Sequence, residues 1–279
     1  MKMTYKELYD KGVAWLEEAQ IEGAGLDARL LLEEICGTNR NDLLVHGDNE
    51  ITERQQECYV NYIEQRKKHV PLQHILGYQE FMGLRFRVTG DVLIPRQDTE
   101  TLVEEVMRNL HDGMHILDMC TGSGCILLSL LRYSNDCVGT GCDISEKALG
   151  IARENARLLG LEAEFIQSDL FEKVKGKYEI LVSNPPYIAS GEIPSLMEEV
   201  REHDPRQALD GGEDGLFFYR EIIQGAGEHL YPGGMLFFEI GYDQGETVSG
   251  YMRQAGYKEV IVCKDLSGLD RVVSGIYGG

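Results

Sequence analysis

The sequence predicts an α/β protein in which a doubly wound, mostly parallel, seven-stranded sheet follows a small all-helical domain. From about residue 98 onward, apolar strand candidates alternate with amphipathic helix candidates, which is typical of a parallel sheet connected by helices. Residues 1–70 show only helical spacing, and residues 81–94 show the alternation of a β-hairpin. The expected boundaries are 1–76 for the helical domain, 77–97 for a β-hairpin linker and 98–279 for the sheet domain.

Two capping boxes begin helices in the N-terminal domain. Thr4 stands three residues before Glu7, and this pair predicts a helix that extends to about residue 20. Thr52 and Gln55 have the same spacing and open another helix.

The remaining helix signals of this domain are single residues. Asp27 is the predicted N-cap of a helix between the two capping boxes, and Gly37 is its predicted end because glycine tolerates the left-handed conformation. Pro71 is expected to end the last helix, since proline lacks the amide proton that a helix interior needs.

The hairpin and the sheet follow from apolar spacing. Apolar and basic residues alternate over 84–88, a turn sequence occupies 89–91, and an apolar stretch at 92–94 is the expected second strand. The predicted strands of the sheet are 114–119, 137–142, 162–167, 178–183, 234–240, 257–263 and 270–277. The predicted helices between them are 98–110, 124–133, 145–159, 216–230 and 245–255.

The chain is strongly acidic, with a net charge of −20. Residues 1–80 hold 9 Lys and Arg against 15 Asp and Glu, and the rest holds 18 against 32, so neither part is basic. A protein that follows a phosphate backbone usually carries a basic face. The charge balance therefore disfavours a nucleic-acid substrate.

Cysteine usage and hydropathy predict a soluble, cytoplasmic protein. The seven cysteines form no CxxC pair and the seven histidines lack zinc-ligand spacing, so we expect free, buried thiols and no metal site. The N-terminus lacks the apolar core of a signal peptide. No apolar run approaches the ~20 residues of a membrane span.

A glycine-rich turn follows the strand candidate at 114–119. The apolar strand runs directly into this turn and an apolar helix comes next, an arrangement in which glycines allow a ligand to approach the backbone. The candidate ligand-binding residues here are Asp118, Cys120, Thr121, Gly122, Ser123 and Gly124. An ordinary strand–helix turn remains the alternative for this segment alone.

Asp143 strengthens the ligand-binding interpretation. It ends the second strand, 21 residues after Gly122, where an acidic group can accept hydrogen bonds from ribose hydroxyls. The turn lacks both the full GxGxxG and the Gly-Lys-Ser/Thr of a phosphate-binding loop. Asp118 suits a cationic ligand end, so S-adenosylmethionine, which has an ammonium and a sulfonium but no phosphate, is the expected ligand. Ser168–Phe171 would either contact its adenine or, through Asp169, cap a helix.

A stiff loop follows the fourth strand and is the predicted acceptor site. Asn184-Pro185-Pro186-Tyr187 contains two prolines that fix the backbone, and the asparagine before them is extended. The Asn184 side-chain oxygen and the Pro185 carbonyl are two acceptors that suit an NH₂ group, while Tyr187 offers a flat face to a planar group. The loop therefore indicates methyl transfer to a planar nitrogen.

These residues resemble the class I S-adenosylmethionine-dependent methyltransferases, and the chain is similar to their release-factor glutamine N5-methyltransferase branch. The segments that carry the resemblance are Pro71–Gly77, Ile94–Glu100, Asp118–Gly124, Asn184–Tyr187, Pro205–Gly212 and Asp214–Leu216. The tetrapeptide alone is shared with adenine and guanine N-methyltransferases. Its combination with the helical domain and with Ile94–Glu100 is more specific.

The resemblance implies a Rossmann-like methyltransferase fold and S-adenosyl-L-methionine as cofactor, with S-adenosyl-L-homocysteine as product. The implied substrate is the glutamine of the Gly-Gly-Gln motif in class I peptide chain release factors, proteins of translation termination, which the helical domain would contact. Residues 120–124, Asp143 and Leu170 would hold the cofactor, and Asn184 would touch cofactor and glutamine. The sequence departs from the usual family pattern at Cys120, Ser123 and Leu170.

Several alternatives remain open at this stage. An adenine N-methyltransferase would apply the same two-acceptor chemistry to a flipped base. A close relative would methylate a ribosomal-protein glutamine. A non-catalytic cofactor-binding protein is a third alternative, against which the intact Asn184 loop argues.

Two further segments have open roles. Arg96, Asp98 and Glu100 either order the domain junction, gate the cofactor or form a salt-bridged helix start. Residues 190–215 form either a helix and lid over the substrate or a solvated loop.

Overall fold

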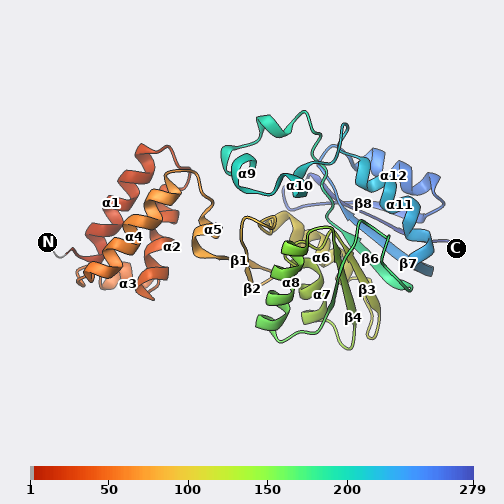
Figure 1. The fold of residues 1–279 in the computed structure, drawn as a ribbon, viewed down its shortest axis with the longest axis horizontal. Helices are drawn as coiled ribbons and strands as arrows, with labels where there is room; N and C mark the ends of the chain where they lie inside the picture. The colour runs from red at the N-terminus through yellow and green to blue at the C-terminus, as the bar shows by residue number, and fades with distance from the viewer. Residues whose placement is uncertain (1–2) are drawn as a thin grey trace. The chain divides into compact units, whose positions relative to one another are not determined.

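The computed structural model describes residues 3–279, which form two compact units. The first unit runs to Gly77 and also includes Met197–His203. The second unit comprises Tyr78–Leu196 and Asp204–Gly279. Figure 1 shows the helices of the first unit and the sheet of the second. The seven residues 197–203 thus group with the helices although the flanking chain belongs to the sheet unit.

Within the described residues, the first unit is helical apart from one isolated β-bridge between Thr4 and Glu50. Both predicted capping boxes are confirmed, because the Thr4 and Thr52 hydroxyls accept from the backbone N–H of Glu7 and Gln55, whose side chains bond back to the caps. The helices are α1 Tyr5–Glu18, α2 Ala24–Cys36, α3 Arg40–Val45, α4 Glu53–Arg66, α5 Leu72–Leu76 and α9 Glu198–His203. The short helices α3 and α5 were not predicted, since each is too brief to show a period.

Two of the helix boundaries differ from those predicted. Helix α2 begins at Ala24 after Gly23, so Asp27 is not its cap but a buried residue in its first turn. Gly37 ends α2 as predicted, with φ of 63°. Helix α4 ends at Arg66, before Pro71, because His69 takes a left-handed φ of 57° that interrupts the helix first.

The hairpin lies one strand earlier than predicted. Strand β1 (Tyr78–Phe81) pairs with β2 (Leu84–Arg87) through a tight turn at Met82 and Gly83, which both have positive φ. The turn predicted at 89–91 and the strand predicted at 92–94 are wrong, because residues 88–94 pair with no strand. Val88 and Val92 pack against Ala148 instead, which accounts for their apolar character.

All seven predicted strands of the sheet are confirmed. The order in the sheet is β5-β4-β3-β6-β7-β9-β8, in which the first five strands are parallel and β9 is antiparallel to both neighbours. The strands are β3 His115–Met119, β4 Val138–Asp143, β5 Glu164–Gln167, β6 Tyr178–Ser183, β7 Leu230–Glu239, β8 Lys258–Lys264 and β9 Asp270–Ile276.

The five predicted helices of this unit are confirmed and cover both faces of the sheet. They are α6 Glu100–Met107, α7 Cys125–Tyr133, α8 Glu146–Leu159, α11 Phe217–His229 and α12 Gly245–Gln254. Residues 190–215 form no single helix: within them lie only η2 (Ile193–Ser195), α9 and α10 (Arg206–Leu209), and η1 (Gln97–Thr99) precedes α6.

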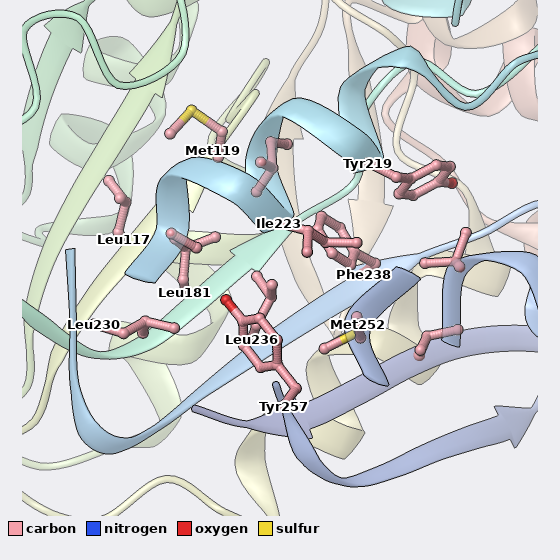
Figure 2. Close-up of a cluster of buried hydrophobic side chains, with 14 of the residues drawn as sticks. Leu117, Met119, Leu181, Tyr219, Ile223, Leu230, Leu236, Phe238, Met252 and Tyr257 are labelled. Atoms are coloured by element: carbon pink, nitrogen blue, oxygen red, sulfur yellow. The ribbon is translucent and has the colours of Figure 1, made fainter. Parts of the chain in front are cut away.

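Alternating strand residues build a core on each face. Figure 2 shows the face that α11 and α12 cover, where Leu117, Leu181 and Phe238 meet Tyr219 and Met252. Helices α6 and α7 cover the opposite face, which presents residues such as Ile116, Ile180, Val182, Phe237 and Val272. Burying each such side chain contributes about 1.5–3 kcal/mol, so the strands that carry the site are firmly held.

All seven cysteines are free, as predicted, but Cys58 is exposed and only Cys125 and Cys142 are fully buried. Among residues 3–279, no helix combines the length and apolar character that crossing a bilayer requires.

Candidate functional site

The carboxyl ends of β3 and β6 lie side by side at the point where the strand order reverses. From β3 the chain proceeds outward to β4 and β5, and then returns to add β6 on the other side of β3. Open α/β sheets bind ligands in the crevice at such a point. The Ser183 hydroxyl donates to the Met119 carbonyl over 2.6 Å, which ties the two strand ends together.

The turn after β3 has the backbone that a ligand site needs. Gly122 has φ of 55°, and a Cβ added to it would meet nothing within 4 Å, so this residue borders open space. Gly124 has φ of 79° and caps α7, where an added Cβ would lie 3.2 Å from the Ala152 side chain. The first glycine therefore leaves room above the backbone, and the second permits close packing of α7 on α8.

Asp118 lies beneath this turn and is fully buried. Its Oδ2 atom accepts a 2.6 Å hydrogen bond from the Thr121 hydroxyl. Burial raises the pKa of Asp118 to about 7, against the lowering effect of that hydrogen bond. In this position Asp118 supports the turn from below.

Asp143 ends β4 and faces the same turn. Its Oδ2 atom accepts from the Gly122 N–H and its Oδ1 atom from the Ser145 N–H, each over 2.9 Å. Burial raises the pKa of Asp143, while these backbone hydrogen bonds lower it. Since each carboxylate oxygen has a second lone pair, the group can also accept from ligand hydroxyls.

One cavity of about 1020 Å³ joins the turn, Asp143 and the acceptor loop. The predicted site residues that line it are Cys120, Thr121, Gly122, Ser123, Asp143, Leu170, Asn184 and Pro186. The predicted site residues that do not line it are Asp118, Gly124, Pro185 and Tyr187. The structure therefore brings the two predicted halves of the site, donor and acceptor, to one cavity.

The acceptor loop is held from behind by residues to which the sequence assigned no role at the site. The Asn184 Nδ2 atom donates to the Thr99 hydroxyl over 3.4 Å. The Tyr187 hydroxyl donates to Glu239 over 3.5 Å, and the Tyr187 carbonyl accepts from Gln244 over 3.0 Å. Burial raises the pKa of Tyr187, and the Glu239 charge adds to this effect.

Comparison with known proteins places the chain in a family. The PrmC N-terminal domain model matches residues 7–77, and the methyltransferase small domain model matches residues 97–217. The release factor glutamine methyltransferase of Geobacter sulfurreducens is 40% identical, over 99% of this chain and 97% of that protein. The Moorella thermoacetica protein of the same name is 42% identical, over 96% and 97%. This chain belongs to the release factor glutamine methyltransferase family.

Solved structures agree with the fold of this family member. A methyltransferase from Pyrococcus furiosus aligns with a TM-score of 0.54 and 17% identity, over 71% of this chain and 90% of its own. The Thermus thermophilus 16S rRNA N2 G1207 methyltransferase, solved with AdoMet and guanosine, aligns at 0.52 and 17%, over 72% and 49%. The Rossmann-like methyltransferase fold is therefore confirmed.

The far wall of the cavity in this family member comes from segments that no sequence pattern connects. Phe171 and His229 stack with ring centroids 4.8 Å apart and an interplanar angle of 7°. Residues 169–173 form turns and no helix, so Asp169 is not a helix cap and lines the cavity instead. From α11 the cavity receives Phe217, Phe218, Glu221, Gln224, Gly225, Glu228 and His229. In the sequence, these residues show only the amphipathic spacing of a helix, and this spacing does not predict that one side of the helix lines a cavity.

The three charged residues at the start of α6 have separate contacts: Arg96 and Asp98 precede this helix, and Glu100 is its first residue. Arg96 lines the cavity, and its Nη2 atom donates to Asp204 over 2.6 Å. Asp98 pairs with Arg271 at 3.3 Å. Glu100 accepts from the backbone N–H of Met82 over 2.6 Å and so holds the hairpin turn, which orders this part of the chain. No group of three or more His, Cys, Asp or Glu suited to a metal occurs within residues 3–279.

Proposed function

We propose that this chain transfers a methyl group from S-adenosylmethionine to the side-chain amide N5 of the glutamine in the Gly-Gly-Gln motif of class I peptide chain release factors. The observation that carries this proposal is that Asn184 lines the same cavity as the Cys120–Ser123 turn and Asp143. The acceptor class is supported by relatives named release factor glutamine methyltransferase at about 40% identity over nearly the whole chain.

The residues of the cavity fit S-adenosylmethionine. The space over Gly122 admits a ligand close to the backbone, and the Asp143 carboxylate keeps lone pairs for ribose hydroxyls. Leu170 and Ile144 supply apolar surface at the same cavity for an adenine ring. When bound there, this cofactor supplies a methyl group that the sulfonium charge activates for transfer.

The acceptor amide is oriented by Asn184 and Pro185. Because the Asn184 Nδ2 atom is bound to Thr99, its Oδ1 atom is the one available to accept from a substrate NH₂ group. The carbonyl of Pro185, the residue between the cavity-lining Asn184 and Pro186, is the proposed second acceptor. Together they hold the NH₂ group and favour rotation of its delocalised lone pair toward the methyl group, and such orientation lowers the barrier. The proton leaves after transfer, so no strong base is required.

The helical unit is the proposed recognition module for the release factor, with residues 1–76 as its extent. This assignment rests on the match of residues 7–77 to the PrmC N-terminal domain. The expected partner is therefore a protein of translation termination, and we propose that the enzyme acts in the cytoplasm.

Mass spectrometry of a release factor incubated with the enzyme and S-adenosylmethionine tests the proposal. We expect a methyl group on the glutamine of its Gly-Gly-Gln motif. Methylation of nucleic acid or of a ribosomal protein, with none on the release factor, would overturn the acceptor assignment. Cofactor binding without any turnover would instead favour a non-catalytic protein.

Asn184→Ala tests the role of the loop. Turnover should fall about 10²–10³-fold, as when one positioned hydrogen-bonding group is removed from other active sites. Calorimetric affinity for S-adenosylmethionine should change far less, because the other cofactor contacts remain. Asn135→Ala, on an exposed turn, is the matched control. Near-normal turnover of the Asn184 variant would refute the two-acceptor mechanism.

A further inference from the structure

Glu239 is a buried carboxyl group directly behind the acceptor loop. It ends β7, whose Phe238 is in register with Ser183 of β6, so Glu239 and Asn184 occupy adjacent positions at the strand ends. The residue is only 2% exposed. Because an apolar side chain would pack more cheaply at this place, the carboxyl group calls for an explanation.

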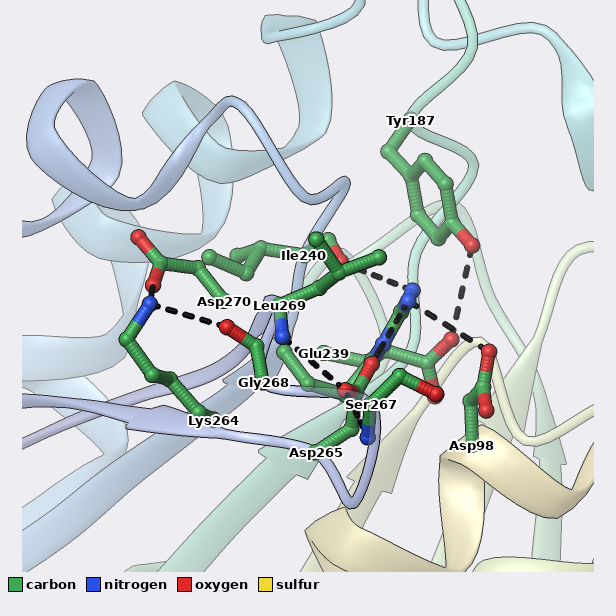
Figure 3. Close-up of polar contacts among 11 residues, drawn as sticks. Asp98, Tyr187, Glu239, Ile240, Lys264, Asp265, Ser267, Gly268, Leu269 and Asp270 are labelled. Atoms are coloured by element: carbon green, nitrogen blue, oxygen red, sulfur yellow. Dashed lines mark hydrogen bonds and ion pairs between the residues drawn. The ribbon is translucent and has the colours of Figure 1, made fainter.

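The carboxyl group contacts the acceptor loop directly. The Tyr187 hydroxyl donates to its Oε1 atom, as Figure 3 shows. The strand end itself is fixed, since the Tyr219 hydroxyl donates to the Glu239 backbone carbonyl over 2.9 Å. Glu239 thus presents its side chain to Tyr187 from a rigid support.

Thr99 lies between the Glu239 carboxyl group and Asn184. The Thr99 oxygen accepts from the Asn184 Nδ2 atom, so its single proton is free to be donated elsewhere. Beside Thr99, the Glu239 Oε2 atom is buried and has no hydrogen-bond partner, and the Thr99 hydroxyl lowers the pKa of this carboxyl group. Donation of the Thr99 proton to this atom would leave the Thr99 lone pairs facing Asn184, and would so determine which end of the Asn184 amide points to the substrate.

Charged residues near Glu239 affect the ionisation of its carboxyl group. The positive charge of Arg271 on β9 favours the ionised form of Glu239, but Arg271 is itself bound to Asp265 at 3.0 Å and to Asp98 at 3.3 Å, so it only partly offsets the buried charge. Burial raises the pKa of Glu239 to about 7, while Thr99, Arg271 and the Tyr187 hydroxyl lower it and the Asp98 charge raises it.

We propose that Glu239 is a positioning residue for methyl transfer, which orients Asn184 through Thr99 and anchors the loop through Tyr187. This inference rests on the function proposed above. It assigns a role to a residue that does not line the cavity and that acts through the two loop residues it holds.

The test compares Glu239→Gln and Thr99→Val in the full-length chain. Glutamine keeps the shape but offers one acceptor oxygen to two donors, and valine removes the hydroxyl while keeping its volume. Each substitution should lower kcat about tenfold, the effect of one lost hydrogen bond, and leave the Kd for S-adenosylmethionine within about threefold. Glu239→Ala should lower kcat further than Glu239→Gln. If the alanine variant does not fold, the two isosteric variants decide the question.

The double variant separates a relay from two independent effects. Glu239→Gln combined with Thr99→Val should lose little beyond Thr99→Val alone, because the route to Asn184 is already interrupted. The matched control is Glu246→Gln, an exposed acid in the first turn of α12. Three results would each overturn the inference. The first is a wild-type kcat for Glu239→Gln, and the second is a double variant whose loss of kcat equals the product of the two single losses. The third is a loss of cofactor affinity as large as the loss of kcat.

A measurement without substrate distinguishes this inference from the function on which it rests. The Asn184 side-chain NH₂ signals in ¹⁵N NMR spectra, identified by their loss in Asn184→Ala, should shift in Glu239→Gln and stay unchanged in Glu246→Gln. If the wild type methylates no release factor but these signals shift, the proposed function fails and the positioning role stands. If they do not shift, the positioning role fails whatever the substrate is.

Discussion

Replacing Asp143 with alanine removes the acidic group at the tip of β4 and should weaken S-adenosylmethionine binding. In the structure this carboxylate accepts from the Gly122 and Ser145 backbone N–H groups over 2.9 Å and lines the cavity. The substitution therefore removes the proposed ribose acceptor and loosens the turn that the cofactor would contact.

The expected magnitude follows from the number of hydrogen bonds involved. A hydrogen bond to a charged group contributes about 1.5–3 kcal/mol, and every 1.4 kcal/mol is tenfold in affinity. Loss of one such bond to the ribose should raise Kd roughly 10- to 100-fold. The substitution also removes the acceptor of the Gly122 N–H and so loosens the turn. Ordering the turn when the cofactor binds then costs free energy, which raises Kd further.

Isothermal titration calorimetry with the full-length chain measures this effect, and circular dichroism establishes that each variant is folded. Glu162→Ala removes one acidic charge from an exposed position and controls for the change in net charge. An unchanged Kd for a folded Asp143→Ala variant would refute both the ribose contact and the role of Asp143 in ordering the turn.

Two further predictions concern buried charge. Asp27→Ala leaves Arg66, whose side chain is 5% exposed, with only Glu199 as acidic partner, and should lower the free energy of unfolding of the helical unit by about 3 kcal/mol. The surface variant Glu64→Ala should lower it by at most about 0.5 kcal/mol in the same urea titration. Equal effects of the two substitutions would contradict the importance of the buried pair. Burial raises the pKa of Asp118 from 3.8 to about 7, so the folded protein keeps a proton that the unfolded chain releases, and this group makes stability fall as pH rises from about 4 to 7. Asp118→Asn should therefore lose less stability than the wild type between pH 5 and pH 8, and identical pH dependence in urea unfolding would refute that origin.

Much of the secondary structure could be read from local patterns. The strands of the sheet, the helices between them and both capping boxes depend on residues close in sequence, whose spacing reports burial directly. The turn at 120–124 and the loop at Asn184 were also found locally, because glycine and proline restrict the backbone in recognisable ways.

The wrong predictions concern residues whose contacts with residues distant in the sequence outweigh their local conformational preference. Asp27 has the chemistry of a helix cap, but its carboxylate binds Arg66, 39 residues away, inside α2 and α4. Val92 belongs to an apolar stretch that reads as a strand, but it packs against Ala148 without pairing. In both cases a tertiary contact outweighed the local preference.

The sequence by itself determined the strand–helix alternation, the glycine-rich turn after β3, the acid at the end of β4 and the stiff loop at Asn184, because each depends on the residues beside it. Only the tertiary structure decided which side chains meet. Thr99 bonds to Asn184 across 85 positions and Glu239 to Tyr187 across 52, since strand order brings their ends together. Spacing along the chain carries no information about that order, so the support of the acceptor loop became visible only once the sheet was assembled.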